Sequence, residues 1–268
     1  MSVNEPAIGI FDSGVGGLTV LRQIAERLPN ESLIYLGDTA RVPYGTKSAD
    51  TVIRYARTCA DILLKEGVKL LVVACNTASA FALERLQADL DVPVVGVIEP
   101  GAESALAKTR NRRIGVIGTA GAIGSGAYPA ALHARDPNVD VFVQACPLFV
   151  PLAEEGWTSG EIPLLIARTY LEPLIRNRAD TLVLGCTHYP LLHAVIAQTM
   201  GESVAIVDSA EATAEAVAAI VEGMGIGAEA GSTAYRRFLV TDAPENFGRI
   251  GRQFLGYDTG PVEWVDVQ

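Results

Sequence analysis

The chain has 268 residues, of which 49% are hydrophobic and 19% charged, values ordinary for a folded protein with a substantial core. Its formal net charge of −10 repels phosphate backbones and argues against nucleic acid as a partner. The first residues carry no leader-like pattern, and no apolar run approaches the roughly 18 residues of a spanning helix, so we expect a cytoplasmic protein without membrane contact.

Short apolar runs that end in Gly, Asp or Cys alternate with helical patterns along the chain. The apolar runs cover residues 8–11, 33–36, 70–74, 94–98, 114–117, 139–143, 182–184 and 204–207. The helical patterns cover residues 18–27, 49–65, 81–88, 164–174 and 191–200. This alternation predicts an α/β fold with mainly parallel sheets flanked by helices.

A weak internal repeat indicates two similar lobes. Residues 8–14 can be laid over residues 114–120 at an offset of 106. Breakers at 99–101 and 207–209 suggest where the chain crosses between lobes and returns. We therefore expect a first α/β lobe of residues 1–98 plus 209–268, a second of residues 99–208, and an active site between them.

The end of the first predicted strand runs into a glycine-rich turn, Asp12-Ser13-Gly14-Val15-Gly16-Gly17. Such a turn can present backbone N–H groups to an anion, and Asp12 suits an ammonium group, so together they fit an amino-acid substrate. The glycine spacing does not match the dinucleotide pattern. The simpler alternative is a tight turn in which Asp12 or Ser13 caps the next helix.

Two of the four cysteines, Cys75 and Cys186, directly follow apolar runs, at the strand ends where α/β proteins bind ligands. Cys75 precedes a helix that we expect to begin near Ala78, with Asn76 or Thr77 as its cap, and a helix N-terminus lowers the pKa of a thiol. His188 lies two residues after Cys186 and can tune that thiol, and Glu154 could orient the histidine. The alternatives are buried packing cysteines, a capping histidine and a surface glutamate.

All four cysteines are expected to be free thiols in a reducing compartment, because Cys59, Cys75, Cys146 and Cys186 are too few for a disulfide framework. None has the CxxC spacing, and only three histidines are present, so we expect no metal site.

Two strand-end thiols suit one reaction better than others. A cysteine hydrolase has no use for the second thiol, and a dithiol redox site usually comes from one CxxC turn. Inversion at a carbon acid needs an acid and a base on opposite faces. None of the four lysines directly follows a predicted strand, which argues against a pyridoxal Schiff base, so we expect no cofactor. Hydroxyl and amide groups to hold a substrate carboxylate would come from Ser13, Asn76, Thr77, Thr119 and Thr187.

Six motifs together make the chain resemble the bacterial glutamate racemases, within the cofactor-independent aspartate/glutamate racemase superfamily. The match runs over nearly the whole chain, and its markers are Asp12-Ser13-Gly14-Val15-Gly16-Gly17, Gly37-Asp38-Thr39 with Pro43-Tyr44-Gly45, Cys75-Asn76-Thr77-Ala78-Ser79, Gly115-Val116-Ile117-Gly118-Thr119, Phe149-Val150-Pro151-Leu152 with Glu154, and Gly185-Cys186-Thr187-His188-Tyr189-Pro190.

The resemblance implies interconversion of L- and D-glutamate for peptidoglycan synthesis, without a cofactor and commonly as a homodimer. Cys75 would act on the D-enantiomer and Cys186 on the L-enantiomer, assisted by Asp12 and by the pair of Glu154 and His188. The residues implied in holding the substrate are Asp12, Ser13, Pro43, Tyr44, Gly45, Asn76, Thr77, Thr119, Thr187 and His188.

One position departs from the family pattern, and two other functions stay open. Ala122 stands where family members usually carry a second threonine, and the loss of that hydroxyl could change affinity or side-chain preference. The chain begins close to its first predicted strand, so we expect no extension of the kind some relatives use for activator control. The alternatives are a racemase for aspartate or another acidic amino acid, and a racemase-fold regulatory protein such as an inhibitor of DNA gyrase.

Overall fold

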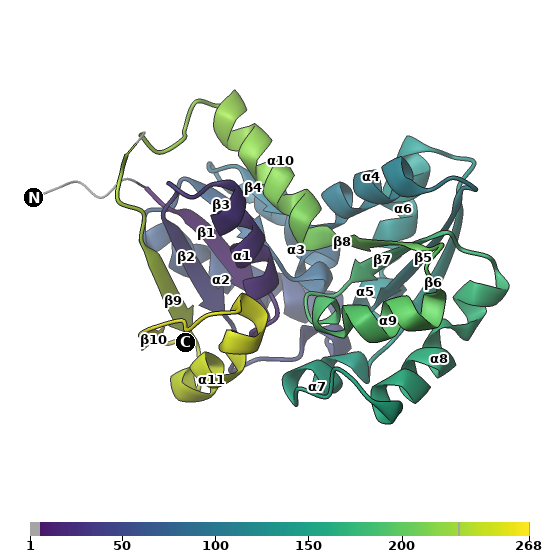
Figure 1. The fold of residues 1–268 in the computed structure, drawn as a ribbon. Helices are drawn as coiled ribbons and strands as arrows, with labels where there is room; N and C mark the ends of the chain where they lie inside the picture. Colours follow the sequence, from purple (N-terminus) through teal and green to yellow (C-terminus); the bar gives the residue numbers. More distant parts are fainter. Residues whose placement is uncertain (1–5, 230, 268) are drawn as a thin grey trace, which may run out of the picture.

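The computed structural model describes residues 6–229 and 231–267. The first five residues, for which the sequence predicts no leader, lie outside this part. Within the described residues, ten strands form two separate sheets in which every pairing is parallel. Figure 1 places one sheet on each side of the molecule, with helices packed around both. The predicted α/β class is confirmed.

The first sheet has six strands in the order β10-β9-β2-β1-β3-β4. Its members are β1 (Ile8–Asp12), β2 (Leu33–Gly37), β3 (Leu70–Val73), β4 (Val94–Gly96), β9 (Arg236–Val240) and β10 (Val262–Trp264). Alternate residues of β1 face opposite layers, since Ile8 and Ile10 belong to one core cluster and Phe11 to another. Because helices cover both faces, β1, β2 and β3 are buried along their whole length.

The second sheet has four strands in the order β6-β5-β7-β8, namely β5 (Arg113–Gly118), β6 (Asp140–Ala145), β7 (Thr181–Gly185) and β8 (Ala205–Asp208). This order repeats the β2-β1-β3-β4 order of the first sheet. The strands β1 and β5, which carry the weak sequence repeat, take the same place in their sheets. The residues that follow β3 and β7 are therefore topologically equivalent.

Eleven α-helices and two short 3₁₀ helices cover the sheets within the described residues. They are α1 (Leu18–Arg27), η1 (Tyr44–Thr46), α2 (Ala49–Lys65), α3 (Asn76–Asp89), α4 (Ile98–Lys108), α5 (Ala120–Gly124), α6 (Ala127–Arg135), α7 (Phe149–Glu154), α8 (Glu161–Arg176), η2 (Tyr189–Leu192), α9 (His193–Met200), α10 (Ser209–Gly223) and α11 (Pro244–Leu255). In α1 the buried residues Leu18, Leu21 and Ile24 recur at helical spacing and form the face that packs on the sheet.

The chain passes from the first sheet to the second through α4 and returns through α10. Residues 99–101, expected as a break at the crossing, instead lie in the first turn of α4. A proline fits there because the N–H groups of a first turn have no acceptor within the helix. One continuous core cluster includes Ala102 of α4, Ala214 of α10 and residues from both sheets. The two lobes therefore share a packed connection, and the boundaries at 98/99 and 208/209 stay predictions.

Candidate active site

Cys75 lies between β3 and α3, with its backbone in the position that caps the helix. Its Sγ lies 3.7 Å from Ser13 Oγ. Burial and the nearby charge of Asp12 raise the pKa of Cys75 to about 12, although the backbone N–H of Ala78 acts in the opposite direction. The expectation of a lowered pKa was therefore wrong, because desolvation outweighs the positive end of the helix.

Asp12 ends β1 and is fully buried behind the thiol. Its Oδ2 accepts a hydrogen bond from the N–H of Gly14 at 3.0 Å, and the N–H groups of Ser13 and Gly17 also favour its carboxylate. The glycine-rich turn therefore directs these donors to Asp12 rather than to a substrate anion. Burial nevertheless raises the pKa of Asp12, and its Oδ1 has no hydrogen-bond partner among the described residues. Neither Asp12 nor Ser13 caps α1, whose N-cap is Gly17.

Cys186 follows β7 and belongs to a chain of three side chains. Its Sγ lies 3.9 Å from His188 Nδ1, and His188 Nε2 lies 2.9 Å from Glu154 Oε1, at the end of α7. Burial lowers the pKa of His188, but the contacts with Cys186 and Glu154 outweigh burial and raise it to about 10. The imidazole is therefore protonated at neutral pH, and a positive charge faces the sulfur of Cys186.

Asn76 and Thr77 begin α3 but do not cap it with their side chains, contrary to expectation. Asn76 Oδ1 accepts from the hydroxyl of Tyr128 at 2.8 Å, and Thr77 Oγ1 lies 2.9 Å from Thr119 Oγ1, which belongs to the other lobe. The Nδ2 of Asn76 is buried and has no partner in the described part of the chain. Both side chains are thus drawn toward the junction of the lobes.

The loop after β2 brings Pro43, Tyr44 and Gly45 to the same place. The Tyr44 hydroxyl donates to the buried carboxylate of Asp38, and the single N–H of Arg41 Nε is shared between the two oxygens of that carboxylate. This anchoring holds the loop, because a buried carboxylate is stable only when paired and hydrogen-bonded.

Two glycines let the lobes approach closely. A Cβ on Gly16 would lie 2.4 Å from both His188 Nδ1 and Thr187 Oγ1. A Cβ on Gly45 would lie 2.6 Å from Thr119 Cβ. Larger residues at these positions would push the lobes apart.

All these segments surround one small cleft between the carboxyl ends of the two sheets. Its lining residues are Ser13, Val42, Pro43, Tyr44, Gly45, Cys75, Asn76, Thr77, Thr119, Val150, Gly185, Cys186, Thr187 and His188. Asp12 and Glu154, which were also predicted for the site, lie just behind this lining and contact it through the interactions above. The cleft volume is about 40 Å³, compared with roughly 300–1,000 Å³ for common ligand sites, so the lobes are closed.

Some residues around the cleft were not predicted. Val42, Val150 and Gly185 line it, and each adjoins or belongs to a motif that the sequence analysis quotes. The ring of Phe254, from α11, stands edge-on to His188 with centroids 5.3 Å apart. Nothing local in the sequence indicates this contact, because the two residues are far apart along the chain.

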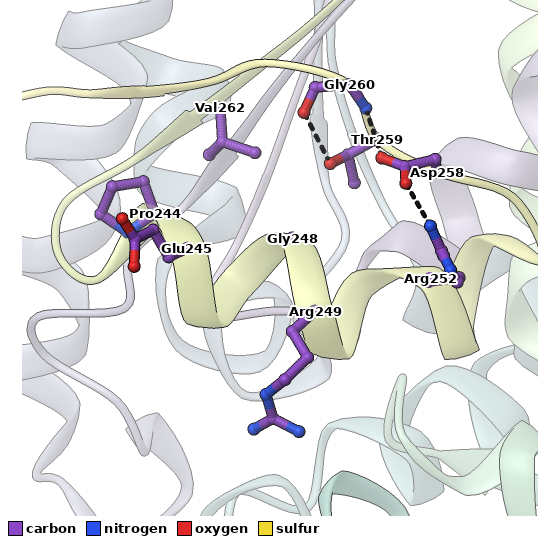
Figure 2. A pocket seen from close by; sticks show the side chains of 9 residues that line it. All are labelled: Pro244, Glu245, Gly248, Arg249, Arg252, Asp258, Thr259, Gly260 and Val262. Carbon is purple, nitrogen blue, oxygen red and sulfur yellow. Dashed lines mark hydrogen bonds and ion pairs between the residues drawn. The ribbon is translucent and has the colours of Figure 1, made fainter.

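A larger cavity, of about 550 Å³, lies elsewhere, between α11 and the segment from Asp258 to Val262. Figure 2 shows its side chains, with Arg252 directed toward Asp258 and Arg249 extending away from that segment. The cavity is lined by none of the predicted site residues and by no thiol. The small cleft, where unpaired polar atoms and shifted pKa values converge, is the stronger candidate.

Residues 6–229 and 231–267 lack two features that would indicate other functions. No cluster of three or more His, Cys, Asp or Glu side chains could hold a metal ion. No helix there has both the length and the apolar character required to cross a membrane.

Comparison with known proteins assigns the family. Residues 8–217 match the family described as Asp/Glu/Hydantoin racemase. The chain belongs to this racemase family. Its family relatives include the glutamate racemase of Geobacter metallireducens, which is 57% identical over 98% of this chain and 97% of that protein.

Solved structures of family members share the fold. The structure of glutamate racemase isoform RacE1 from Bacillus anthracis gives a TM-score of 0.94 at 42% identity and covers 98% of both chains. The glutamate racemase from Francisella tularensis, solved in complex with D-glutamate, gives a TM-score of 0.92 at 37% identity over 99% of both chains. An aspartate racemase from Picrophilus torridus, at 19% identity and a TM-score of 0.59, is similar in fold alone.

Proposed function

We propose that the chain is a glutamate racemase that interconverts L- and D-glutamate through Cys75 and Cys186, without a cofactor, and supplies D-glutamate for peptidoglycan synthesis. The observation that carries the proposal is that two thiols from equivalent strand ends, after β3 and β7, line one cleft. Relatives named glutamate racemase that match nearly full length favour glutamate over aspartate.

The proton transfers follow from the two thiol environments. With L-glutamate bound, Cys186 acts as a thiolate beside the cationic His188 and removes the α-proton, so that an S–H bond forms as the C–H bond breaks. The electron pair stays on the substrate as a carbanion delocalised into its carboxylate. The thiol of Cys75, whose raised pKa keeps it protonated, then donates its proton to the opposite face and gives D-glutamate. The reverse reaction exchanges the two roles.

Unpaired polar atoms in the cleft lining and directly behind it match the charges of an amino acid. The free Oδ1 of Asp12 would accept from the substrate ammonium group, and the free Nδ2 of Asn76 would donate to a carboxylate. Hydroxyl groups of Ser13, Thr77, Thr119 and Thr187 would supply the remaining hydrogen bonds. Pro43, Tyr44 and Gly45 would form the wall facing the substrate.

Proton NMR of glutamate in deuterated buffer, without pyridoxal phosphate, tests the reaction. We expect the α-proton signal of either enantiomer to disappear while the opposite enantiomer forms. Cys75→Ala and Cys186→Ala should each reduce racemisation by at least about 100-fold, because each removes one of the two acid–base groups. Cys59→Ser, which removes a buried thiol outside the cleft lining but keeps a polar atom beside the Tyr44 hydroxyl, is the matched control and should retain activity.

Other results of these assays would indicate a different function or mechanism. Exchange with aspartate but not with glutamate would indicate an aspartate racemase, and exchange with neither would leave a binding or regulatory role. Racemisation that survives in either thiol variant would rule out the two-thiol mechanism. A homodimer stays a prediction, which light scattering on the purified protein tests.

A further inference from the structure

Tyr128, in α6, joins the two lobes at the back of the cleft without lining it. The side chain is 1% exposed, and its hydroxyl donates to Asn76 Oδ1 at 2.8 Å. Tyr128 belongs to the lobe of the four-stranded sheet, whereas Asn76 begins α3 beside the six-stranded sheet. The hydrogen bond therefore crosses the lobe junction.

The surroundings of Tyr128 fix both its ring and its hydroxyl. A Cβ on Gly185, the residue directly before Cys186, would lie only 3.0 Å from the ring. The Ser209 hydroxyl, at the start of α10, acts to lower the pKa of Tyr128, against the larger effect of burial. Burial raises the pKa of Tyr128, so the phenol is neutral at physiological pH and its hydroxyl can donate. Tyr128 is thus held between the segments that carry the two thiols.

The hydroxyl of Tyr128 donates to the oxygen of the Asn76 amide, so the nitrogen of that amide faces the other way. An amide has an accepting oxygen and a donating nitrogen on opposite sides, and Tyr128 occupies the oxygen. The nitrogen, Nδ2, is then left buried without a partner among the described residues, on a side chain that lines the cleft. A reversed amide would present its oxygen to the cleft and repel a carboxylate.

We propose that Tyr128 is a positioning residue for racemisation, whose hydroxyl orients the Asn76 amide so that its NH₂ group donates to the substrate carboxylate. This inference rests on the proposed function, because it needs a carboxylate substrate in the cleft. It assigns to α6 a part in substrate binding that neither cysteine motif indicates.

A double-mutant cycle with Tyr128→Phe and Asn76→Ala tests the inference. Tyr128→Phe should raise the KM for both glutamate enantiomers about three- to tenfold, the factor that corresponds to one net hydrogen bond, with a smaller change in kcat. In the Asn76→Ala background the same change should alter KM less than about twofold, because Tyr128 acts through Asn76. Equal effects of Tyr128→Phe in both backgrounds, or a fall in kcat at constant KM, would overturn the inference.

Tyr189→Phe is the matched control, since Tyr189 is also fully buried and its hydroxyl donates to the Cys146 carbonyl at 2.8 Å. Whatever its effect, it should be the same with and without Asn76→Ala. Non-additivity equal to that of Tyr128→Phe would mean a general loss of packing, and would count against a specific role of Tyr128.

A measurement on the unmodified residue covers the case in which Tyr128→Phe does not fold. The side-chain NH₂ signals of Asn76, assigned by their loss in Asn76→Ala, should shift when D-glutamate binds to the wild-type protein. Unchanged signals at saturating D-glutamate would contradict the inference. The wild-type racemisation assay separates the two proposals. An inactive wild-type protein would contradict both the racemase function and the role of Tyr128. An active wild-type protein in which the effects of Tyr128→Phe and Asn76→Ala simply add would contradict only the role of Tyr128.

Discussion

The two thiols differ in their immediate surroundings although they occupy equivalent strand ends. Cys75 has a hydroxyl, Ser13, and a buried carboxylate, Asp12, as neighbours, and both burial and this carboxylate favour the protonated thiol. Cys186 instead faces His188, which is held by Glu154. At the scale of single residues, the cleft is therefore built with one thiol as a proton donor and the other beside a positive charge.

His188 should make stability depend on pH in the alkaline range. Its pKa rises from about 6.5 in the unfolded chain to about 10 in the folded protein. The folded state then binds more protons than the unfolded state between these values, so the contribution of His188 is fully present below about pH 6.5 and is lost as pH rises through about 10. Urea unfolding from pH 6 to pH 10.5 should show a steeper loss for wild type than for His188→Asn. Parallel pH dependences would refute this assignment.

Among the elements, the glycine-rich turn between β1 and α1 has a different role from the one its pattern indicates. The pattern predicts a site for an anion, but the structure uses the turn's N–H groups on Asp12 and its lack of side chains for close approach. Gly17 leaves room for Asp12 and the hydroxyl of Tyr35, and Gly16 leaves room for His188. The turn thus shapes the cleft from inside the first lobe.

Gly16→Ala should therefore impair catalysis more than folding. The added methyl group would overlap with His188 and Thr187 across the lobe junction, and displacing catalytic groups by about 1 Å can cost on the order of 100-fold in rate. Gly223→Ala is the control, because a Cβ there meets nothing within 4 Å and should stabilise the end of α10 by about 0.5–1 kcal/mol. Racemisation rates and thermal melts of both variants check this, and an unimpaired Gly16→Ala enzyme would contradict it.

Local patterns predicted the elements that carry the thiols but not the C-terminal ones. The runs that became β3 and β7 are short, apolar and bounded by polar residues, so their strand ends could be placed. In contrast, β9 begins with two arginines and β10 has only three residues. Both are strands because they extend the first sheet, with β9 paired to β2 and β10 paired to β9. Tyr128 and Phe254 reach the site only through tertiary packing, which no spacing rule conveys.

At the scale of the whole molecule, the cleft is too small for the substrate we propose. Its volume of about 40 Å³ lies well below that of common ligand sites, and contacts such as Thr77 to Thr119 close it from both lobes. The lobes are joined through α4 and α10, as Figure 1 shows. For the proposed function we therefore expect the lobes to separate around these two connections when glutamate enters.

Hydrogen exchange should detect this opening and closing. D-glutamate should slow exchange at residues 14–17 and 186–190, which face each other across the cleft, while the buried centres of β1 and β7 should exchange equally slowly in both states. D-leucine, which lacks the side-chain carboxylate, is the control ligand and should have little effect. Equal exchange rates at residues 14–17 and 186–190 with and without D-glutamate would argue against lobe motion.

After each turnover, the protonation state of the two thiols in the proposed enzyme depends on which enantiomer was converted last. After L-glutamate becomes D-glutamate, Cys75 is left without its proton and Cys186 with one, although burial and Asp12 favour the protonated thiol at Cys75. The empty enzyme must then return a proton to Cys75 and release one from Cys186 before it can accept L-glutamate again. This resetting consumes no substrate, yet every successive turnover in one direction has to include it.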